Sequence, residues 1–488
     1  MLVLADREVL RCDAYVDGAW TPAKSGRRFA VHNPATRDIL AEVPDLEPDD
    51  ARGAIEAAQR AFPAWSAKTA KERAIVLRRW FELIVAAQED LAQLMTAEQG
   101  KPLAETRGEV AYGASFIEWF AEEGRRVYGD VIPTHAAGKR ILVLKQPIGV
   151  VTAITPWNFP IAMITRKVAP ALAAGCSVVV KPPDETPLSA LALAALAERA
   201  GLPPGVLNVI TTTQAQQVGL ELTQNPKVRK FSFTGSTEVG RQLMAQCATT
   251  VKKVSLELGG NAPFIVFDDA NLDQAVEGAL VSKYRNMGQT CVCANRFLVQ
   301  NSVYDAFESK LAERVKAMKV GNGADPGVVQ GPLINMAAVD KVERLLADAV
   351  AAGATVEVGG HRHALGGTYF EPTIVSGVTP AMAISREEIF GPVATLARFS
   401  DEGEAVRIAN DTDYGLAAYF YARDLGRVFR VAEALEYGMV AVNDGILSTE
   451  IAPFGGVKQS GIGREGSKYG IEEYLEVKYI LLAGLGAA

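Results

Sequence analysis

The sequence predicts an α/β protein with two doubly wound parallel-sheet domains and a small β extension. Short β-branched runs alternate with helical patterns from residue 149 onward, and a second series of this kind starts after residue 260. Near-continuous apolar strands separated by helices are typical of parallel sheets covered on both faces. Two further strand-like segments, 141–146 and 474–483, belong to neither series.

The elements before the first series have the pattern of helices. Residues 49–100 and 105–124 repeat apolar side chains every three or four positions, which predicts amphipathic helices that pack on the first domain. The strand 141–146, within the segment 129–146, has no crossover helix, and neither has 474–483. We expect these two strands to pair with each other and to leave an edge that a second subunit extends.

The first series ends at a boundary near residues 258–260. Its expected strands are 149–155, 177–182, 206–211, 230–235 and 252–258, and its expected helices are 164–175, 188–201, 215–223 and 236–248. The second series has expected strands 263–267, 296–300, 416–422 and 439–444, a helix ending near residue 289 and a helix over 303–318. The first series has the form of a doubly wound, dinucleotide-type domain.

Composition excludes several classes of protein. The 488 residues are 49% hydrophobic and 22% charged, a globular composition long enough for about two to four domains. The net charge of −7 argues against binding nucleic acid or anionic lipid over the whole surface. We expect a cytoplasmic protein without a membrane span, because the N-terminus lacks the pattern of a targeting peptide, prolines interrupt the uncharged run 146–165, and the five cysteines suit a reducing compartment.

One glycine motif is a decoy, and a second segment is a candidate phosphate site. Gly461, Gly463 and Gly466 match G-x-G-x-x-G, but too little chain follows for a βαβ unit. The segment FSFTGST places Gly235 and Ser236 where a strand ends and a helix begins, and the positive end of that helix suits a phosphate. Taken alone, such a turn is more often structural.

A lysine and an acid supply a second cofactor signal. Lys181 lies at the carboxyl end of the expected strand 177–182, which faces the crevice where open parallel sheets bind ligands. Asp184, three residues later, suits two ribose hydroxyls. The alternative is a surface lysine, with Asp184 and Thr186 capping the next helix. Together with the turn at Gly235, the cofactor interpretation is favoured.

Cys291 is the candidate nucleophile. It lies in the polar segment GQTCVCANR, in a loop where a thiol can meet a substrate and react as a thiolate, although an isolated cysteine is more often structural. No metal site is expected, because zinc needs four ligands and the four histidines are not spaced to complete a set around Cys291 and Cys293. We find neither G-x-S-x-G nor a histidine partner, which excludes a serine hydrolase.

Without a histidine, the base must be a carboxylate or water. Glu257 closes an apolar strand just before the boundary between the two series. Asn158 lies in the segment PWNFP. Glu257 could instead form a boundary salt bridge, and Asn158 could be a simple turn residue. A catalytic role for either residue requires that the fold bring it close to Cys291.

Several motifs in one order identify a family. The chain resembles the NAD(P)-dependent aldehyde dehydrogenases from about residue 15 to residue 480, through PWNFP, FTGST, LELGG, GQTCVCANR and EEIFGP. The resemblance implies the aldehyde-dehydrogenase-like fold, with Cys291 as nucleophile, Glu257 as general base and Asn158 as oxyanion donor. It also implies a nicotinamide cofactor surrounded by Trp157, Lys181, Ser236, Glu388 and Phe390.

The implied reaction has two stages. The Cys291 thiolate attacks the aldehyde carbon while the Asn158 amide and the Cys291 backbone N–H hold the alkoxide, and hydride transfer to the nicotinamide leaves a thioester. Glu257 then activates the water that hydrolyses it.

The motifs also lead to a division of the chain. We expect a dinucleotide-binding domain from residues 1–128 and 147–258, and a catalytic, thiol-bearing domain from 259–455. Residues 129–146 and 456–488 are expected to bridge subunits of a homodimer or homotetramer.

Within the family, the chain looks like the succinate-semialdehyde dehydrogenases. The segments MITRK, KYRNMGQTCVCANR and PFGGVKQSGIGREGSKYGIEEYL are similar to that subgroup. There, two arginines and a serine bind the distal carboxylate of the substrate, and they carry over to Arg166, Arg285 and Ser448. A guanidinium matches a carboxylate with two parallel hydrogen bonds and is always charged. Either arginine alone would more often be part of a surface ion pair.

Three questions stay open at this point. Asp184 would repel a 2′-phosphate, so NAD is the expected cofactor, with NADP as the alternative. Cys293 beside Cys291 suggests an oxidation-sensitive pair that forms a disulfide if the loop contracts from an extended strand. Glutarate semialdehyde or another ω-semialdehyde is the nearest alternative substrate, because one methylene discriminates by only about 1–3 kcal/mol. A CoA-acylating dehydrogenase and an inactive binding protein are more distant alternatives.

Overall fold

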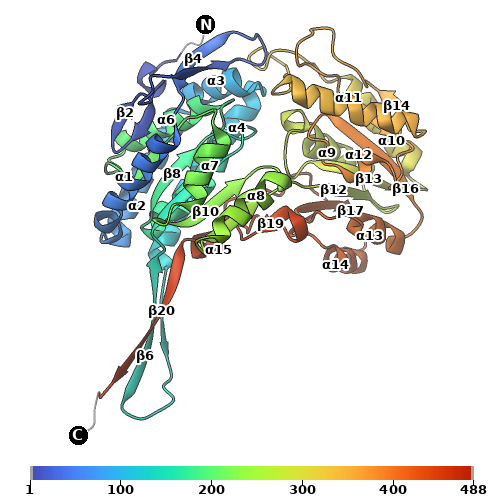
Figure 1. Cartoon of the computed structure of the whole chain (residues 1–488). Helices are drawn as coiled ribbons and strands as arrows, with labels where there is room; N and C mark the ends of the chain where they lie inside the picture. Colours follow the sequence, from blue (N-terminus) through green and yellow to red (C-terminus); the bar gives the residue numbers. More distant parts are fainter. Residues whose placement is uncertain (1–3, 485–488) are drawn as a thin grey trace.

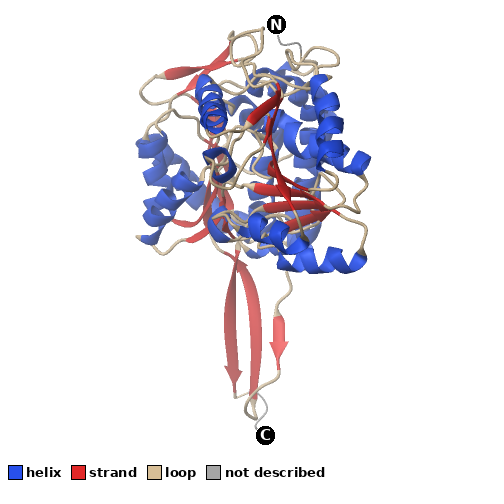
Figure 2. Ribbon diagram, turned by 90° about the vertical axis from the view of Figure 1, so that its right-hand side faces the viewer, coloured by secondary structure: helices blue, strands red, loops and turns tan. Residues whose placement is uncertain are grey.

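Two sheets of mostly parallel strands form the two halves of the molecule, and a β arm extends away from both (Figure 1). The computed structural model describes residues 4–484. The blue-to-green half contains an eight-stranded sheet, and the yellow-to-red half contains a seven-stranded sheet. In the view of Figure 2, helices flank the body on both sides, whereas the arm contains strands alone.

The eight-stranded sheet has the order β19-β11-β10-β7-β8-β9-β1-β2. Its parallel strands are those expected: β7 (Val150–Ile154), β8 (Ser177–Lys181), β9 (Leu207–Val209), β10 (Val228–Thr234) and β11 (Lys253–Glu257). Between them run α5 (Ala162–Ala174), α6 (Pro187–Arg199), α7 (Ala215–Gln224) and α8 (Thr237–Ala248). The sheet edges are antiparallel and were not expected: β1 (Ala14–Val16), β2 (Ala19–Thr21) and β19 (Gly461–Ile462).

The N-terminal helices pack on this sheet, as the amphipathic pattern predicts. They are α1 (Pro48–Ser66), α2 (Ala70–Ala86), α3 (Gln88–Gln99) and α4 (Leu103–Glu123), flanked by η1 (Arg7–Val9) and η2 (Gly124–Arg126). A capping box between Thr69 and Glu72 starts α2. The buried Glu98 carboxylate accepts hydrogen bonds from the Leu188 and Ser189 N–H groups and so caps α6. A separate hairpin is formed by β3 (Arg28–His32) and β4 (Ile39–Pro44).

The seven-stranded sheet begins after β11, so the chain changes sheet over residues 258–261. Its strands, in spatial order, are β14 (Thr355–Val358), β15 (Thr373–Ser376), β16 (Val393–Phe399), β13 (Ala294–Gln300), β12 (Ala262–Val266), β17 (Ala417–Tyr421) and β18 (Met439–Val442). Its helices are α9 (Leu272–Tyr284), η3 (Arg285–Gly288), α10 (Tyr304–Lys316), α11 (Met336–Ala351), α12 (Ala383–Arg386), α13 (Glu402–Asn410) and α14 (Leu425–Ala434). All pairings are parallel except β14 with β15.

The arm joins strands from distant parts of the chain, which confirms the expected pairing. β6 (Lys139–Pro147) and β20 (Leu475–Ala483) are antiparallel along their whole length. A short strand that was not expected, β5 (Asp130–Ile132), extends this ribbon. Val131 and Val477 expose 76% and 67% of their surface, so the arm presents apolar side chains to solvent. An apolar, partly unpaired edge of this kind favours association with another chain.

The glycine motif near the C-terminus builds structure. Gly461 lies in β19, antiparallel to β11, between η4 (Lys458–Ser460) and α15 (Ser467–Glu472). The segment therefore does not form a βαβ phosphate loop. Within residues 4–484, no helix is long and apolar enough to cross a membrane. Over the same range, no three His, Cys, Asp or Glu side chains are grouped to hold a metal ion.

Candidate active site

The half-buried Cys291 lies in a tight turn between η3 and β13. The turn closes with a hydrogen bond from the Cys293 N–H to the Thr290 carbonyl at 3.0 Å. Just before it, Asn286 and Met287 have left-handed φ values of 51° and 55°. Non-glycine residues take this conformation only where the surroundings hold them there. The segment leading to the thiol is therefore fixed by its neighbours.

Asn286 is held from three directions. Its N–H donates to the Glu105 carboxylate at 2.8 Å, and its side-chain amide donates to the Asn158 carbonyl at 2.9 Å. Its Oδ1 accepts from Gln99 Nε2 at 3.0 Å. The side chain of Asn158 is also buried, and its Nδ2 donates to the Gln289 carbonyl at 3.0 Å. Asn158 is thus joined to both sides of the segment that precedes Cys291.

Two cavities meet at Cys291. One of about 350 Å³ is lined by Trp157, Gly235, Ser236, Glu388 and Phe390, among others, and also by Asn158. The second, of about 270 Å³, is lined by Arg166, Arg285, Ser448, Tyr112 and Glu105, among others. Because the thiol lies where they join, one cavity can present a cofactor and the other a substrate to the same sulfur.

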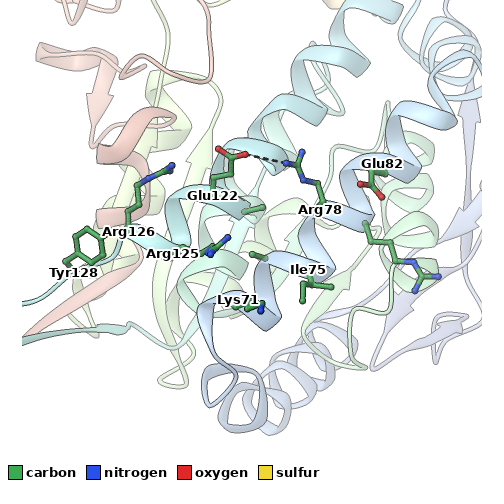
Figure 3. Close-up of a pocket in the computed structure, with 11 residues that line it drawn as sticks. Lys71, Ile75, Arg78, Glu82, Glu122, Arg125, Arg126 and Tyr128 are labelled. Carbon is green, nitrogen blue, oxygen red and sulfur yellow. Dashed lines mark hydrogen bonds and ion pairs between the residues drawn. The ribbon is translucent and has the colours of Figure 1, made fainter.

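A larger surface groove lies elsewhere. It has a volume of about 850 Å³ and runs along α2 and α4, where Arg78 pairs with Glu122 (Figure 3). Its lining includes Lys71, Arg125 and Arg126 but no cysteine, serine or histidine. Volume alone therefore does not locate the chemistry.

The larger of the two cavities at Cys291 suits a dinucleotide. The N-terminus of α8 opens into it, and Ser236 caps this helix by accepting a hydrogen bond from the Val239 N–H. Such a helix end stabilises a phosphate. A Cβ atom at position 235 would lie 2.4 Å from the Phe233 ring, so only glycine fits this turn. Trp157 and Phe390 meet edge-on, with ring centroids 5.6 Å apart, and form an aromatic wall.

Glu388 is fixed at the inner end of this cavity. Its Oε1 accepts from the Gly260 N–H at 3.0 Å. Burial raises the pKa of Glu388 to about 7, an effect that this hydrogen bond partly offsets. Lys181 and Asp184 do not line the cavity. Lys181 is buried at the carboxyl end of β8, and the side chain of Asp184 is exposed just beyond it.

The Cys291 thiol is protonated in this environment. Burial raises its pKa to about 12, the guanidinium of Arg166 lowers it, and the carboxylates of Glu388 and Glu257 raise it further. A thiol with this pKa needs a base to become nucleophilic at neutral pH. Cys293, in contrast, is buried and donates its Sγ–H to the Lys283 carbonyl at 3.2 Å.

Glu257 ends β11 and is buried, and its charge acts on the Cys291 thiol although it lines neither cavity. Burial and the nearby Glu465 carboxylate raise the pKa of Glu257 well above its usual value, against the opposing effect of Arg166 and Lys167. No residue within 4–484 forms a hydrogen bond with its Oε2. A buried carboxylate with a raised pKa and a free oxygen is suited to accept a proton near neutral pH.

The second cavity brings together the three residues expected to bind a carboxylate. Arg166 on α5, Arg285 in η3 and Ser448 in the loop after β18 all line it with Cys291. The two arginines differ in their surroundings. Arg166 forms a buried ion pair with Glu465 at 2.7 Å, whereas Arg285 forms no ion pair within the described part of the chain.

Arg285 lies near an aromatic ring and lacks the ion pair that Arg166 forms. Its Cζ lies 5.5 Å from the centroid of the Phe159 ring. The nearby Glu105 carboxyl has its pKa raised to about 6 by burial, and the charges of Lys101 and Arg285 partly offset this effect. Arg285 is therefore the arginine whose charge is more available to a ligand.

Sequence reasoning missed two groups of residues at the site. Glu465 forms ion pairs with both Arg166 and Lys167, and it lies within the glycine motif that the sequence analysis set aside as a decoy. The phenol of Tyr112 is enclosed in the second cavity with no hydrogen-bond partner in residues 4–484. Lys167 follows Arg166 in the segment MITRK, and two adjacent basic residues on a buried helix could have indicated a buried acidic partner. Nothing local in the sequence marks Glu465.

Known proteins match this arrangement over nearly the whole chain. The model of the aldehyde dehydrogenase family matches residues 20–480. The chain belongs to the aldehyde dehydrogenase family. Glutarate-semialdehyde dehydrogenase of Pseudomonas aeruginosa is 64% identical, over 99% of this chain and 100% of that protein. The NADP⁺-dependent succinate-semialdehyde dehydrogenase of Escherichia coli is 63% identical, over 98% of this chain and 99% of that protein.

A solved structure in the same family extends the comparison. Betaine aldehyde dehydrogenase from Staphylococcus aureus in complex with NAD⁺ has a TM-score of 0.96 and 39% identity, covering 98% of this chain and 96% of that one. The fold class and the family expected from the sequence are confirmed. As an aldehyde dehydrogenase, the chain is an oxidoreductase that uses NAD(P).

Proposed function

We propose that this aldehyde dehydrogenase oxidises an aldehyde that carries a distal carboxylate, with succinic semialdehyde as the first candidate. The observation that carries the proposal is Arg285, a guanidinium without an ion-pair partner among the described residues, in the same cavity as Cys291. An unpaired cation in a half-buried cavity favours an anionic ligand. Ser448 and Arg166 line the same cavity and complete the proposed carboxylate clamp.

Glutarate semialdehyde is the second candidate. The relative from Pseudomonas aeruginosa is named for that activity and is as similar to this chain as the Escherichia coli succinate-semialdehyde dehydrogenase. The two substrates differ by one methylene, for which an enzyme discriminates by about 1–3 kcal/mol. The proposal therefore commits to the class of ω-carboxylated aldehydes.

The proposed chemistry begins at the thiol. Glu257, or a water that it holds, removes the Cys291 proton, and the thiolate attacks the aldehyde carbon entering from the smaller cavity. The alkoxide that forms is stabilised by Asn158 Nδ2 and the Cys291 N–H. Loss of one such donor costs about 2.7–4 kcal/mol in other enzymes.

The cofactor would reach Cys291 from the larger cavity, opposite the cavity proposed for the substrate. The larger cavity would hold the nicotinamide end of the cofactor, where Glu388, Phe390, Gly235 and Ser236 line it. When bound, NAD(P) supplies the acceptor for the hydride of the oxidation. We assign Lys181 and Asp184 to the adenosine ribose, and the Asp184 carboxylate favours NAD over NADP.

Hydrolysis completes the proposed cycle. Glu257 first gives the proton that it took from Cys291 to solvent and then accepts a proton from a water. That water attacks the thioester carbon, the C–S bond breaks, and the carboxylic acid leaves while the Cys291 sulfur is regenerated. A CoA-acylating enzyme would need no base at this step, and the buried Glu257 with its free Oε2 supports hydrolysis. Added CoA should therefore leave the rate of acid formation unchanged.

The direct test is formation of NADH or NADPH with succinic semialdehyde, glutaric semialdehyde and butanal as substrates. The proposal expects kcat/KM for both semialdehydes to exceed that for butanal. Equal values for all three would remove the carboxylate clamp. No turnover of any aldehyde would favour the alternative of an inactive binding protein.

The same proposal covers the division of labour along the chain. We assign residues 1–128 and 147–258 to cofactor binding, 259–455 to the thiol, and 129–146 with 456–488 to contacts in a homodimer or homotetramer. The apolar arm formed by β6 and β20 supports the last assignment. Five cysteines without disulfides support a reducing, cytoplasmic location.

A further inference from the structure

A fully buried ion pair lies directly behind the proposed oxyanion donor. Lys101 is in the short loop between α3 and α4, and its side chain is 0% exposed. Its ammonium donates to Glu109 Oε2 at 2.6 Å and to the main-chain carbonyl of Asn158, also at 2.6 Å. The nitrogen lies 3.9 Å from the centroid of the Phe159 ring.

Glu109 binds the far end of the segment that begins at Asn158. Its Oε1 accepts hydrogen bonds from the Ile161 and Ala162 N–H groups at 3.0 and 3.2 Å. These are the first N–H groups of α5, where a negative charge is favourable. Lys101 and Glu109 together therefore fasten the chain from residue 158 to residue 162 at both ends.

The Asn158 carbonyl has a second donor from the other half of the molecule. The Asn286 side-chain amide also donates to it, at 2.9 Å. Gln99 bonds Asn286, and the Gln99 side chain also accepts the Lys101 N–H at 3.0 Å. The loop after α3 thus joins the Asn158 segment to the turn that carries Cys291.

We propose that Lys101, neutralised by Glu109, is a positioning residue that fixes the Asn158 amide at the distance from Cys291 that oxyanion stabilisation requires. The inference rests on the role proposed above for Asn158. Burying an ammonium ion carries a large desolvation penalty, which neutral side chains would avoid. A donor with a fixed charge and two short hydrogen bonds holds a carbonyl more rigidly than a neutral donor.

The geometry gives a specific expectation. A displacement of about 1 Å at a catalytic group lowers the rate by roughly 100-fold. In Lys101→Met the carbonyl loses its charged donor, so we expect kcat to fall by roughly 30- to 100-fold. The KM for butanal should change by less than about threefold, because Lys101 lines neither cavity at Cys291 and butanal has no carboxylate that the unpaired Glu109 in the second cavity would repel.

Lys230 provides a matched control. It is also buried, its ammonium bonds Ser255 and lies 3.3 Å from Glu473, and it lines neither cavity at Cys291. Lys230→Met should lower the thermal midpoint as Lys101→Met does, yet leave kcat within about threefold of wild type. Equal losses of kcat in the two variants would overturn the proposal.

A double-mutant cycle gives the decisive measurement. If Lys101 acts through Asn158, then Lys101→Met should lower kcat by less than about threefold in an Asn158→Ala background. Multiplication of the two single effects would overturn the proposal. If Lys101→Met does not yield folded protein, Lys101→Gln, one bond too short to reach both partners, replaces it in the same cycle. A wild type inactive on every aldehyde would refute the proposed function instead, which keeps the two failures distinct.

Discussion

Replacing Arg285 with alanine tests the substrate assignment most directly. Arg285 forms no ion pair within residues 4–484, so its removal breaks none, and the nearby buried Glu105 carboxyl still has the charge of Lys101 close to it. Arg166 is less suitable, because its loss would strand the buried Glu465, and breaking such a pair costs about 3–5 kcal/mol of stability. Arg285→Ala should therefore report on binding more than on folding.

The expected magnitude follows from the lost interaction. A hydrogen bond to a charged group contributes about 1.5–3 kcal/mol, and each 1.4 kcal/mol is about tenfold in kcat/KM. Arg166 and Ser448 remain in the cavity, so the low end of this range applies to Arg285→Lys and the high end to Arg285→Ala. We expect kcat/KM for succinic semialdehyde to fall roughly 10-fold in Arg285→Lys and roughly 150-fold in Arg285→Ala.

The assay compares two four-carbon aldehydes. Steady-state kcat/KM is measured with succinic semialdehyde and with butanal, which lacks the carboxylate, for wild type, Arg285→Ala and Arg285→Lys. Butanal should lose less than about threefold, because its oxidation does not use the guanidinium. Equal losses for both aldehydes in Arg285→Ala would refute the assignment, since they would show that the arginine acts on the chemistry or the fold.

Three further predictions concern the base, the cofactor and the second cysteine. Glu257→Gln should form NADH slowly, up to one equivalent per site, and then stall as the thioester, because deprotonation of Cys291 and hydrolysis of the thioester both lose their base. Because the raised pKa of Glu257 must be exceeded for it to act as a base, wild-type kcat should rise with pH through that pKa, and steady turnover by the variant would contradict this role. Wild type should use NAD⁺ more efficiently than NADP⁺. Asp184→Ser should raise kcat/KM for NADP⁺ about tenfold, because it removes the carboxylate that repels the 2′-phosphate. Equal efficiencies of wild type with the two cofactors would contradict the preference for NAD⁺. If Cys291 and Cys293 form a disulfide, a thiol reductant should restore the activity of peroxide-treated wild type but not that of peroxide-treated Cys293→Ala. Identical behaviour of the two proteins would exclude the disulfide.

The regular parts of the fold were predictable because each carries its own local signal. β8 and β10 are fully or almost fully buried, so nearly every side chain in them is apolar or bonded, and the run stands out in the sequence. The pairing of β6 with β20 was predictable because neither segment had another partner among the strands expected from the sequence, although β6 also pairs with the short β5. Strands of two or three residues, such as β5 and β19, are too short to show periodicity, and they were missed.

The site was predictable only where motifs mark it. Most of the residues expected at the site line the two cavities at Cys291, whereas Lys181, Asp184 and Glu257 line neither of them. The left-handed turn at Asn286 was not foreseen, because its stability comes from Glu105 and Gln99, which are remote in sequence. Lys101 was missed for the same reason: it meets Asn158, 57 positions away, only in the folded chain.

The arm sets a limit on when this protein can finish folding. Lys145 in β6 bonds Glu472, just before β20, and 327 positions separate them. At about 5–20 residues synthesised per second, β6 waits roughly 16 to 65 s on the ribosome for its partner strand. Throughout that interval an apolar strand is exposed beside other nascent chains. A stop codon before residue 475 would leave β6 with only the three-residue β5 as its partner. The residues of β20 therefore cover an apolar strand edge that could otherwise aggregate, besides shaping the arm.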